Sequence, residues 1–356
     1  MLTAGQLHPY FSRMVLTAQS RILVTGGAGF IGSRLIDELN NRGIERILVA
    51  DFLGQDEKWR NLEPLSFEDY IDAGDLLGAL EAGRLGSFDL ILHMGACSST
   101  TERDAGYLMR NNYEYTRQLA EWSIGHGVRF VYASSAATYG NGEAGMDDSS
   151  ELSSLRCLHP LNMYGYSKHV FDVYAARTGL LDRCVGVKYF NVFGPNEQHK
   201  GEMRSMVNKA YGQIMDAGVV RLFRSYRNDY RDGEQRRDFI YVNDAVAMTL
   251  HLATSERAAG LFNVGSGRAE TWLDLARAVF AAMDLEPRIE FIDMPMHMQA
   301  AYQYSSLADI RRLRESGYEN PITSLELSVR DYVTRYLARG RIALAENHQS
   351  QTVQRE

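Results

Sequence analysis

Short apolar runs alternate with segments of helical spacing from residue 21 onward. The runs "RILVTG", "RILVAD", "DLILHMGA", "RFVYASS" and "RCVGVKYFNVFGP" consist largely of β-branched, aliphatic and aromatic residues. Between them, "SRLIDELNNRG" and "YEYTRQLAEWSIGHG" space their apolar residues as a helix requires. Continuously apolar strands that alternate with helices predict an α/β fold, a doubly wound parallel sheet of the Rossmann type with helices on both faces.

The alternation breaks after Pro195, and this break predicts a second, smaller lobe. The segment that follows is long, polar and locally basic, and "DFIYVNDAVAMTLHLA" then returns as a strand and a helix. We predict a nucleotide-binding domain, a mixed α/β substrate lobe, an N-terminal extension and a polar tail. The predicted bounds are 21–195 with about 237–265 for the domain, 196–236 and 266–340 for the lobe, 1–20 for the extension and 341–356 for the tail.

Composition and charge narrow the class of protein. The chain has 356 residues, of which 45% are hydrophobic and 23% charged, enough for two lobes with a sizeable core. A net charge of −7 argues against a nucleic-acid partner. No apolar run approaches the about 18 residues of a membrane span, so no membrane partner is expected. The three cysteines, Cys97, Cys157 and Cys184, lack paired spacing. We therefore expect no disulfide framework, no metal site and a cytoplasmic location.

The stretch "VTGGAGFIGSRL" predicts a phosphate-binding loop. Gly26, Gly29 and Gly32 follow a predicted strand and open a predicted helix. Backbone N–H groups there can approach a pyrophosphate, and the helix N-terminus adds partial positive charge. The next strand ends in Asp51, 19 residues beyond Gly32, where a carboxylate can accept hydrogen bonds from an adenosine ribose. The spacing therefore predicts a bound dinucleotide.

The choice between NAD and NADP stays open on spacing alone. Asp51 favours NAD, because a carboxylate repels a 2′-phosphate. Lys58 and Arg60 follow within nine residues, and either cation could neutralise that phosphate.

The stretch "NMYGYSKHVF" predicts a proton-transfer group, a name we use for Ser135, Tyr164 and Lys168. Tyr164 and Lys168 stand four residues apart, so on a helix they share one face. A nearby ammonium lowers the pKa of a phenol, and a phenolate can take a proton from an alcohol while hydride leaves for a nicotinamide. Ser135 ends a predicted strand beside the cofactor crevice, where its hydroxyl can bind the reacting alcohol. Tyr166 points elsewhere and is expected to pack.

The motifs "TGGAGFIG" and "YGYSK" resemble the extended short-chain dehydrogenase/reductase family. Within it, five longer stretches are similar to the family of ADP-glyceromanno-heptose 6-epimerases, which are isomerases of lipopolysaccharide inner-core sugar synthesis. They are "GACSSTTE", "NNYEYT", "YASSAATYG", "PLNMYGYSK" and "YFNVFGPNEQHKG". The likeness runs from about residue 21 to residue 337.

This resemblance implies a reaction. NADP would oxidise carbon 6 of ADP-heptose, outside the sugar ring, and the resulting carbonyl group would rotate before it takes hydride back on its other face. Two acid/base residues on opposite sides are then needed, because one base cannot easily serve both faces of a carbonyl. Tyr164 matches one residue of the family's pair, and Lys200 in "EQHKG" matches the other. Ser135 matches the supporting hydroxyl. NAD is the alternative cofactor, and a homo-oligomer is implied.

Other positions carry over from the resemblance as expected contacts. Cofactor contacts are expected from Gly26, Gly29, Phe30, Ile31, Gly32, Asp51, Phe52, Lys58, Met94, Gly95, Ala96, Cys97, Ser98, Asn111, Lys168, Val192 and Lys200. Substrate contacts are expected from Asn191, Glu202, Lys209, Phe223, Arg224, Ser225, Tyr226, Arg237 and Tyr302. An arginine such as Arg237 can grip a diphosphate bidentately.

Several positions depart from the family pattern. Phe52 stands where asparagine is usual, and Ala73 stands where a lysine would add a cation for the 2′-phosphate. In the substrate lobe, Glu202 replaces a small serine and Lys209 a histidine. There "FRSY" also replaces "FEGS", and "RNDYRDGEQR" is inserted before Arg237. The departures bear on the identity of the nucleotide sugar more than on the chemistry.

Three alternatives differ in the residues that they need. A nucleotide-sugar 4-epimerase of the same family would share Tyr164 and Lys168 but not need Lys200, because its ring ketone flips as a whole. A sugar 4,6-dehydratase needs an acid and a base, usually an Asp-Glu pair, where this chain has Ala136 and Ala137. A non-catalytic cofactor-binding scaffold has no need of a tuned phenol.

Overall fold

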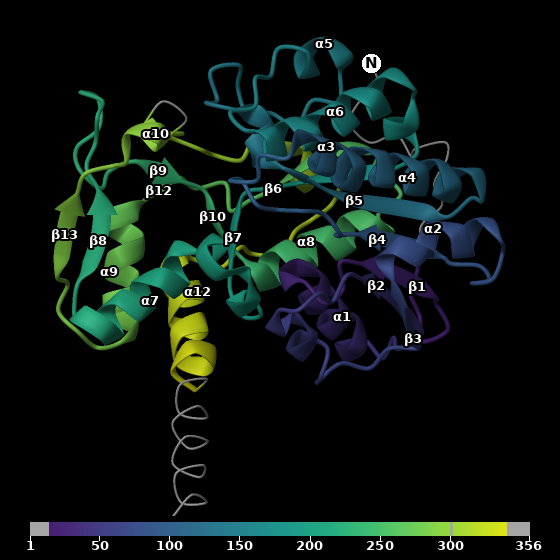
Figure 1. The fold of residues 1–356 in the computed structure, drawn as a ribbon, viewed down its shortest axis with the longest axis horizontal. Coiled ribbons are helices and arrows are strands. Elements are labelled where there is room, and N and C mark those ends of the chain that lie inside the picture. The colour runs from purple at the N-terminus through teal and green to yellow at the C-terminus, as the bar shows by residue number, and fades with distance from the viewer. Residues whose placement is uncertain (1–13, 300–301, 340–356) are drawn as a thin grey trace, which may run out of the picture.

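Seven parallel strands form the main sheet (Figure 1). The structure is a computed structural model that describes residues 14–299 and 302–339; the predicted polar tail and most of the predicted N-terminal extension lie outside the described residues. The strand order is β3 (Asp69–Asp72), β2 (Ile47–Asp51), β1 (Ile22–Thr25), β4 (Leu90–His93), β5 (Arg129–Ser135), β6 (Val185–Tyr189) and β11 (Gly260–Val264). Every neighbouring pair is parallel, which confirms the predicted sheet.

Helices cover both faces of this sheet. Successive side chains along a strand point to opposite faces, so each central strand contributes to two hydrophobic clusters, one on each face. Ile22 and Val24 of β1 belong to one cluster, and Leu23 between them belongs to the other. The first cluster includes residues of α1 (Phe30–Asn41) and α8 (Val242–Thr254), and the second includes residues of α2 (Ala73–Glu81), α4 (Tyr115–Gly125) and α6 (Met163–Arg177).

The direction in which the strands are added reverses between β1 and β4. The chain adds β2 and β3 on one side of β1, and then β4, β5 and β6 on the other. In a parallel sheet such a reversal opens a crevice at the carboxyl ends of the strands, and ligands bind there. The fold therefore places the predicted glycine loop and Ser135 at the same edge.

A second lobe lies beside the sheet, to the left in Figure 1. Its helices are α7 (Met206–Ala217), α9 (Trp272–Ala282) and α12 (Leu325–Tyr332), and its parallel strands are β8 (Val220–Phe223) and β13 (Ile289–Ile292). Two further strand pairs are β7 (Asn191–Phe193) with β10 (Phe239–Tyr241), parallel, and β9 (Arg236–Arg237) with β12 (Glu270–Thr271), antiparallel.

Short helical segments complete the described chain. They are α3 (Ala105–Leu108), α5 (Leu152–Leu155), α10 (Met296–Gln299) and α11 (Arg311–Glu315), the 3₁₀ turns Glu57–Asn61, Ala136–Tyr139, Leu180–Asp182 and Gln198–Met203, and the π-helical turns Met109–Glu114 and Val333–Leu337. Within the described ranges, no helix combines the length and the apolar character that a bilayer crossing requires.

Candidate active site

A cleft of about 750 Å³ lies at the carboxyl ends of the central strands. All the residues predicted for catalysis and for cofactor binding line it, and so does Asn191 from the predicted substrate set. The structure therefore brings together, from segments spread between Gly26 and Lys200, the side chains that the motifs singled out. A cleft of this size suits a ligand larger than a single sugar.

The glycine loop forms one end of the cleft and leaves no room for side chains. Gly26 has a φ of +67°, and a Cβ atom there would lie 2.6 Å from the backbone nitrogen of Gly95. A Cβ atom on Gly32 would lie 2.1 Å from the carbonyl oxygen of Gly26. The following helix α1 has Gly29 at its N-cap, with no side chain capping the free N–H groups. This bare, positively polarised helix start fits a pyrophosphate.

Asp51 stands at the end of β2, and its charge is already paired. One carboxylate oxygen accepts from the backbone N–H of Ala28 at 2.9 Å, and the other from Lys58 Nζ at 2.8 Å. Arg60, the other cation considered for a 2′-phosphate, instead pairs with Glu57 and lies over the ring of Trp59. Arg60 does not line the cleft. Of the two candidate cations, Lys58 alone lies at the ribose end.

The proton-transfer group gathers where β5 ends and α6 begins. Asn162 caps α6 by accepting from the backbone N–H of Gly165 at 2.8 Å, so Tyr164 falls in the first turn. Ser135 is the last residue of β5, and its hydroxyl accepts from the backbone N–H of Ala137 at 3.1 Å. Lys168 Nζ donates to the carbonyl oxygen of Ala133 at 2.8 Å.

The electrostatics of this group differ from the expectation in one respect. Burial raises the pKa of Tyr164, and the hydrogen bond with Ser135 opposes that rise, whereas Lys168 makes no resolved contribution to it. Burial also lowers the pKa of Lys168 to about 8, against the opposing charge of Asp172. The predicted lowering of the phenol's pKa by the ammonium is therefore wrong for this arrangement of side chains. The packing expected of Tyr166 is wrong as well, since that side chain is half exposed.

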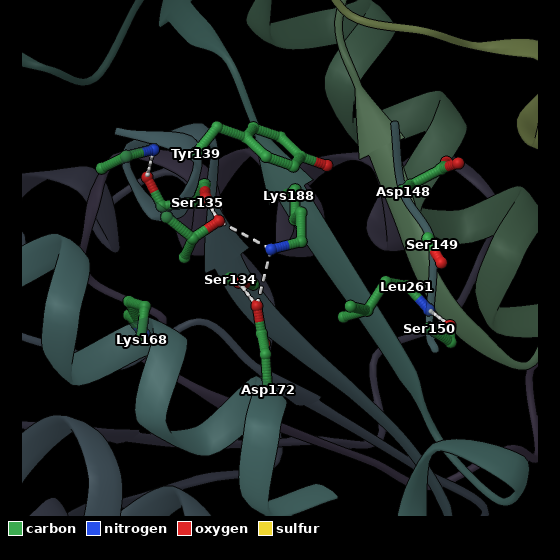
Figure 2. A network of polar contacts seen from close by, with 12 residues as sticks. Ser134, Ser135, Tyr139, Asp148, Ser149, Ser150, Lys168, Asp172, Lys188 and Leu261 are labelled. Carbon is green, nitrogen blue, oxygen red and sulfur yellow. Dashed lines mark hydrogen bonds and ion pairs between the residues drawn. The ribbon is translucent and has the colours of Figure 1, made fainter. Parts of the chain in front are cut away.

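A fully buried ion pair connects α6 with β6, next to the proton-transfer group. Lys188 on β6 lies 2.7 Å from Asp172 on α6, and neither side chain is exposed. Figure 2 shows Asp172 reaching from its helix toward Lys188 and Ser134. Asp172 also accepts from the hydroxyls of Ser134 at 2.8 Å and Tyr132 at 2.9 Å, and Lys188 donates to Thr138 Oγ1 at 2.6 Å. The network ties β5, β6 and α6 together.

Lys200 enters the cleft from the 3₁₀ turn Gln198–Met203, in the segment that leads to the second lobe. Its ammonium lies 5.3 Å from the centre of the Phe30 ring. Burial lowers the pKa of Lys200, and the nearby charge of Glu197 opposes that fall. Lys200 and Tyr164 thus line the same cleft on segments that the fold brings together from different parts of the chain.

The wall formed by the predicted contacts Met94 to Ser98 is held by the turn Met109–Glu114. Asn112, fully buried, accepts from the backbone N–H of Cys97 and donates to its carbonyl oxygen, both at 2.9 Å. It also donates to Ser167 on α6 at 3.0 Å. A single π-helical turn of this kind is typical of functional sites. The sequence motifs did not single out Asn112.

Next to the cleft, Arg237 lies between two aromatic rings. Its guanidinium carbon is 5.5 Å from the Trp272 ring centre and 5.2 Å from that of Tyr302. Trp272 Nε1 donates to the Tyr302 hydroxyl at 2.9 Å. Trp272 lines the cleft and was missed by the sequence analysis. The available signal was "ETWLD", in which Thr271 and Asp274 form a capping box that sets the start of α9 beside the cleft.

The remaining predicted substrate contacts lie outside the cleft lining. Glu202 is exposed and pairs with Lys209 at 3.6 Å. Phe223 ends β8, and the loop after it is held by its own polar contacts. In that loop Arg224 pairs with Asp232 at 3.2 Å, the backbone N–H of Ser225 donates to Asp232 at 2.8 Å, and the Tyr226 hydroxyl donates to Asp293 at 3.2 Å.

The chain is similar to a known protein family and to enzymes that bear a name. Residues 22–265 match the NAD dependent epimerase/dehydratase family. The chain is 51% identical over 317 residues to an ADP-L-glycero-D-manno-heptose-6-epimerase of Nitratidesulfovibrio vulgaris strain Hildenborough, which covers 89% of this chain and 98% of that protein. It is 42% identical over 326 residues to the enzyme of the same name from Fusobacterium nucleatum, with 89% and 98% coverage.

The fold is also similar to that of a solved structure with the same enzyme name. The Helicobacter pylori ADP-L-glycero-D-manno-heptose-6-epimerase superposes with a TM-score of 0.75 and 26% identity, over 91% of this chain and 99% of that chain. The resemblance predicted from the motifs is therefore confirmed.

Proposed function

The chain belongs to the NAD dependent epimerase/dehydratase family, and from that membership we propose that it interconverts ADP-D-glycero- and ADP-L-glycero-D-manno-heptose. The reaction is a transient oxidation at carbon 6. The observation that carries this proposal is the meeting of Tyr164 and Lys200 in one cleft with the glycine loop. A second acid/base residue is what inversion outside the ring requires and what inversion of a ring carbon does not.

The two residues share one transferable proton. When bound, the nicotinamide supplies a reversible hydride acceptor. The deprotonated member of the pair Tyr164 and Lys200 takes the hydroxyl proton as carbon 6, a secondary alcohol, is oxidised to the ketone. After the ketone group rotates, the other member donates its own proton to the oxygen as the hydride returns. Burial lowers the pKa of Lys200, which favours this role because its neutral amine becomes accessible.

Substrate binding falls to the second lobe in this proposal. Arg237, fixed between Trp272 and Tyr302, is the cation that grips the diphosphate. Asn191, the first residue of β7, lines the same cleft as Trp272. A 4-epimerase of the same family remains the second candidate function, supported by the "FRSY" and "RNDYRDGEQR" departures in the substrate lobe.

The proposed reaction predicts a specific NMR result. Purified protein incubated with ADP-heptose in D₂O should invert carbon 6 alone, with no deuterium on that carbon, because hydride leaves and returns without exchange. Proton NMR of the sugar reads both outcomes. Inversion of a ring carbon in UDP- or GDP-sugars, or stoichiometric release of reduced cofactor into solution, would overturn the assignment.

NADP is the cofactor form in this proposal, with Lys58 as the cation for its 2′-phosphate. Lys58 lines the cleft beside Asp51 and neutralises that carboxylate, which reduces its repulsion of a phosphate. NAD is the alternative, since Ala73 supplies no second cation at the cleft.

Replacing Lys58 with methionine should weaken NADP binding by about tenfold or more, because a charged hydrogen bond of about 1.5–3 kcal/mol is lost. NAD binding should change less. Titration calorimetry on cofactor-stripped protein measures both affinities. Arg60→Met is the matched control, because Arg60 pairs with Glu57 and does not line the cleft. Equal losses for the two cofactors, or tighter NAD binding by the unmodified protein, would favour NAD.

A further inference from the structure

Glu197 is a buried carboxylate to which the proposed reaction gives no part. It is fully buried, and its two oxygens receive three hydrogen bonds from the second lobe. Ser205 donates to it twice at 2.6 Å, through its backbone N–H and its hydroxyl, and the Tyr332 hydroxyl donates at 3.0 Å. Tyr332 in turn accepts from Asn208 at 2.9 Å. Glu197 directly precedes the turn that carries Lys200. Its side chain therefore connects this turn to Ser205 at the start of α7 and to Tyr332 in α12.

The backbone of Glu197 also begins the turn that carries Lys200. Its carbonyl oxygen accepts from the backbone N–H of Lys200 at 3.0 Å. Just before it, the carbonyl oxygen of Asn196 accepts from Asn61 at 3.1 Å, which ties the same segment to the nucleotide-binding domain. The position of Lys200 thus depends on a segment anchored on both sides, with Glu197 as its anchor in the second lobe.

Few charges act on the ammonium of Lys200. The ring of Phe30 on α1 lies beneath it. The pKa of the neighbouring His199 is lowered by burial, and the charges that act on this imidazole are those of Asp56, Lys58, Lys200 and Asp51. Arg204 is turned toward the carbonyl oxygen of Gly201 and the side chain of Asn208. Among the described residues, Glu197 is the charged group with a resolved effect on the pKa of Lys200, and it raises that pKa against burial.

We propose that Glu197 is the positioning residue of Lys200: its carboxylate, held by Ser205 and Tyr332, fixes the turn that presents the lysine to the cleft. This inference rests on the proposed function of Lys200 as the second acid/base residue. Glu197 does not line the cleft, so it acts through Lys200 and not on the substrate. Its charge also favours the protonated form of Lys200, against the larger effect of burial.

Glu197→Gln tests the charge while keeping the size of the side chain. The pKa of Lys200 should fall by about one pH unit, because the opposite charge that raises this pKa against burial has been removed. Reductive ¹³C-methylation followed by NMR measures it directly, since the chain has five lysines, Lys58, Lys168, Lys188, Lys200 and Lys209. Lys200→Arg assigns the resonance. The limb of the kcat/KM profile that Lys200 sets should move the same way, with little change in KM.

Tyr332→Phe is the matched control, because it removes one hydrogen bond to Glu197 and leaves the charge. It should leave the Lys200 pKa near the wild-type value. An equal shift in both variants, or none in Glu197→Gln, would overturn the inference. Should Glu197→Gln not fold, Glu197→Asp decides: a retained anion should keep the Lys200 pKa within about half a unit, and a full-unit fall counts against the proposal.

The NMR measurement needs no substrate and so separates the two proposals. If the wild-type protein does not invert ADP-heptose but its Lys200 resonance shifts in Glu197→Gln, the proposed function fails and the electrostatic coupling stands. If the wild type inverts the sugar and the resonance does not move, the proposed function stands and the role given to Glu197 fails.

Discussion

Replacing Lys200 with methionine is expected to slow inversion of ADP-heptose by about 10³-fold, within the range that one general acid/base contributes. Tyr164, Ser135 and Lys168 remain in place in this variant, so one face of the sugar carbon keeps its proton-transfer group. The other face loses its proton donor and acceptor. The loss should appear in kcat measured by NMR.

Nicotinamide binding should persist in Lys200→Met, because the glycine loop and Asp51 are on other segments of the chain. Arg221→Met is a control with the same change of a cation to methionine in the second lobe; Arg221 is an exposed partner of Glu290 and does not line the cleft. Its turnover should match wild type. Undiminished inversion of ADP-heptose by Lys200→Met would show that Lys200 is not the second acid/base residue of this reaction.

The sheet and the cofactor end of the cleft were predictable because their signals are local. Each central strand is a continuous apolar run, since both its faces are buried, and each helix between them carries its own periodicity. The glycine loop has no room for a Cβ atom at Gly26 and Gly32, so closely spaced glycines predict it from the sequence. The edge strand β3 was missed because "DYID" has exposed aspartates at both ends and no apolar run.

Features that depend on contacts between distant segments could not be predicted in this way. The pairing of Lys58 with Asp51 depends on how the 3₁₀ turn after β2 folds back. The capping box in "ETWLD" marks the start of α9, but Trp272 reaches the cleft only because the second lobe docks there. The role of Glu197 follows from Ser205 and Tyr332, which lie 8 and 135 residues away.

The substrate positions illustrate the same limit. The resemblance supplied Glu202, Lys209 and the segment 223–226 as expected contacts, yet in the structure these side chains contact their own neighbours outside the cleft lining. The inserted "RNDYRDGEQR" supplies Asp232, which holds Arg224 and Ser225. An insertion that brings its own partners thus changes the environment of residues before it, and spacing alone does not reveal that.

Lys188→Met is expected to lower the free energy of unfolding by about 3–5 kcal/mol, because it leaves the carboxylate of Asp172 buried without its cation. Both side chains of the pair are 0% exposed, so water cannot replace the ammonium. Urea unfolding of cofactor-stripped protein measures the change without a contribution from bound ligand. Activity should fall as well, since the pair ties the ends of β5 and α6, where Ser135 and Lys168 stand.

The double variant Lys188→Met/Asp172→Leu should be more stable than Lys188→Met, because removing both charges abolishes the uncompensated carboxylate. Arg221→Met is the exposed control: its pair with Glu290 leaves both side chains about half exposed, so the loss should be at most about 1 kcal/mol. A Lys188→Met protein no less stable than Arg221→Met would mean that Ser134 and Tyr132 alone satisfy Asp172, and that the ion pair does not hold the site together.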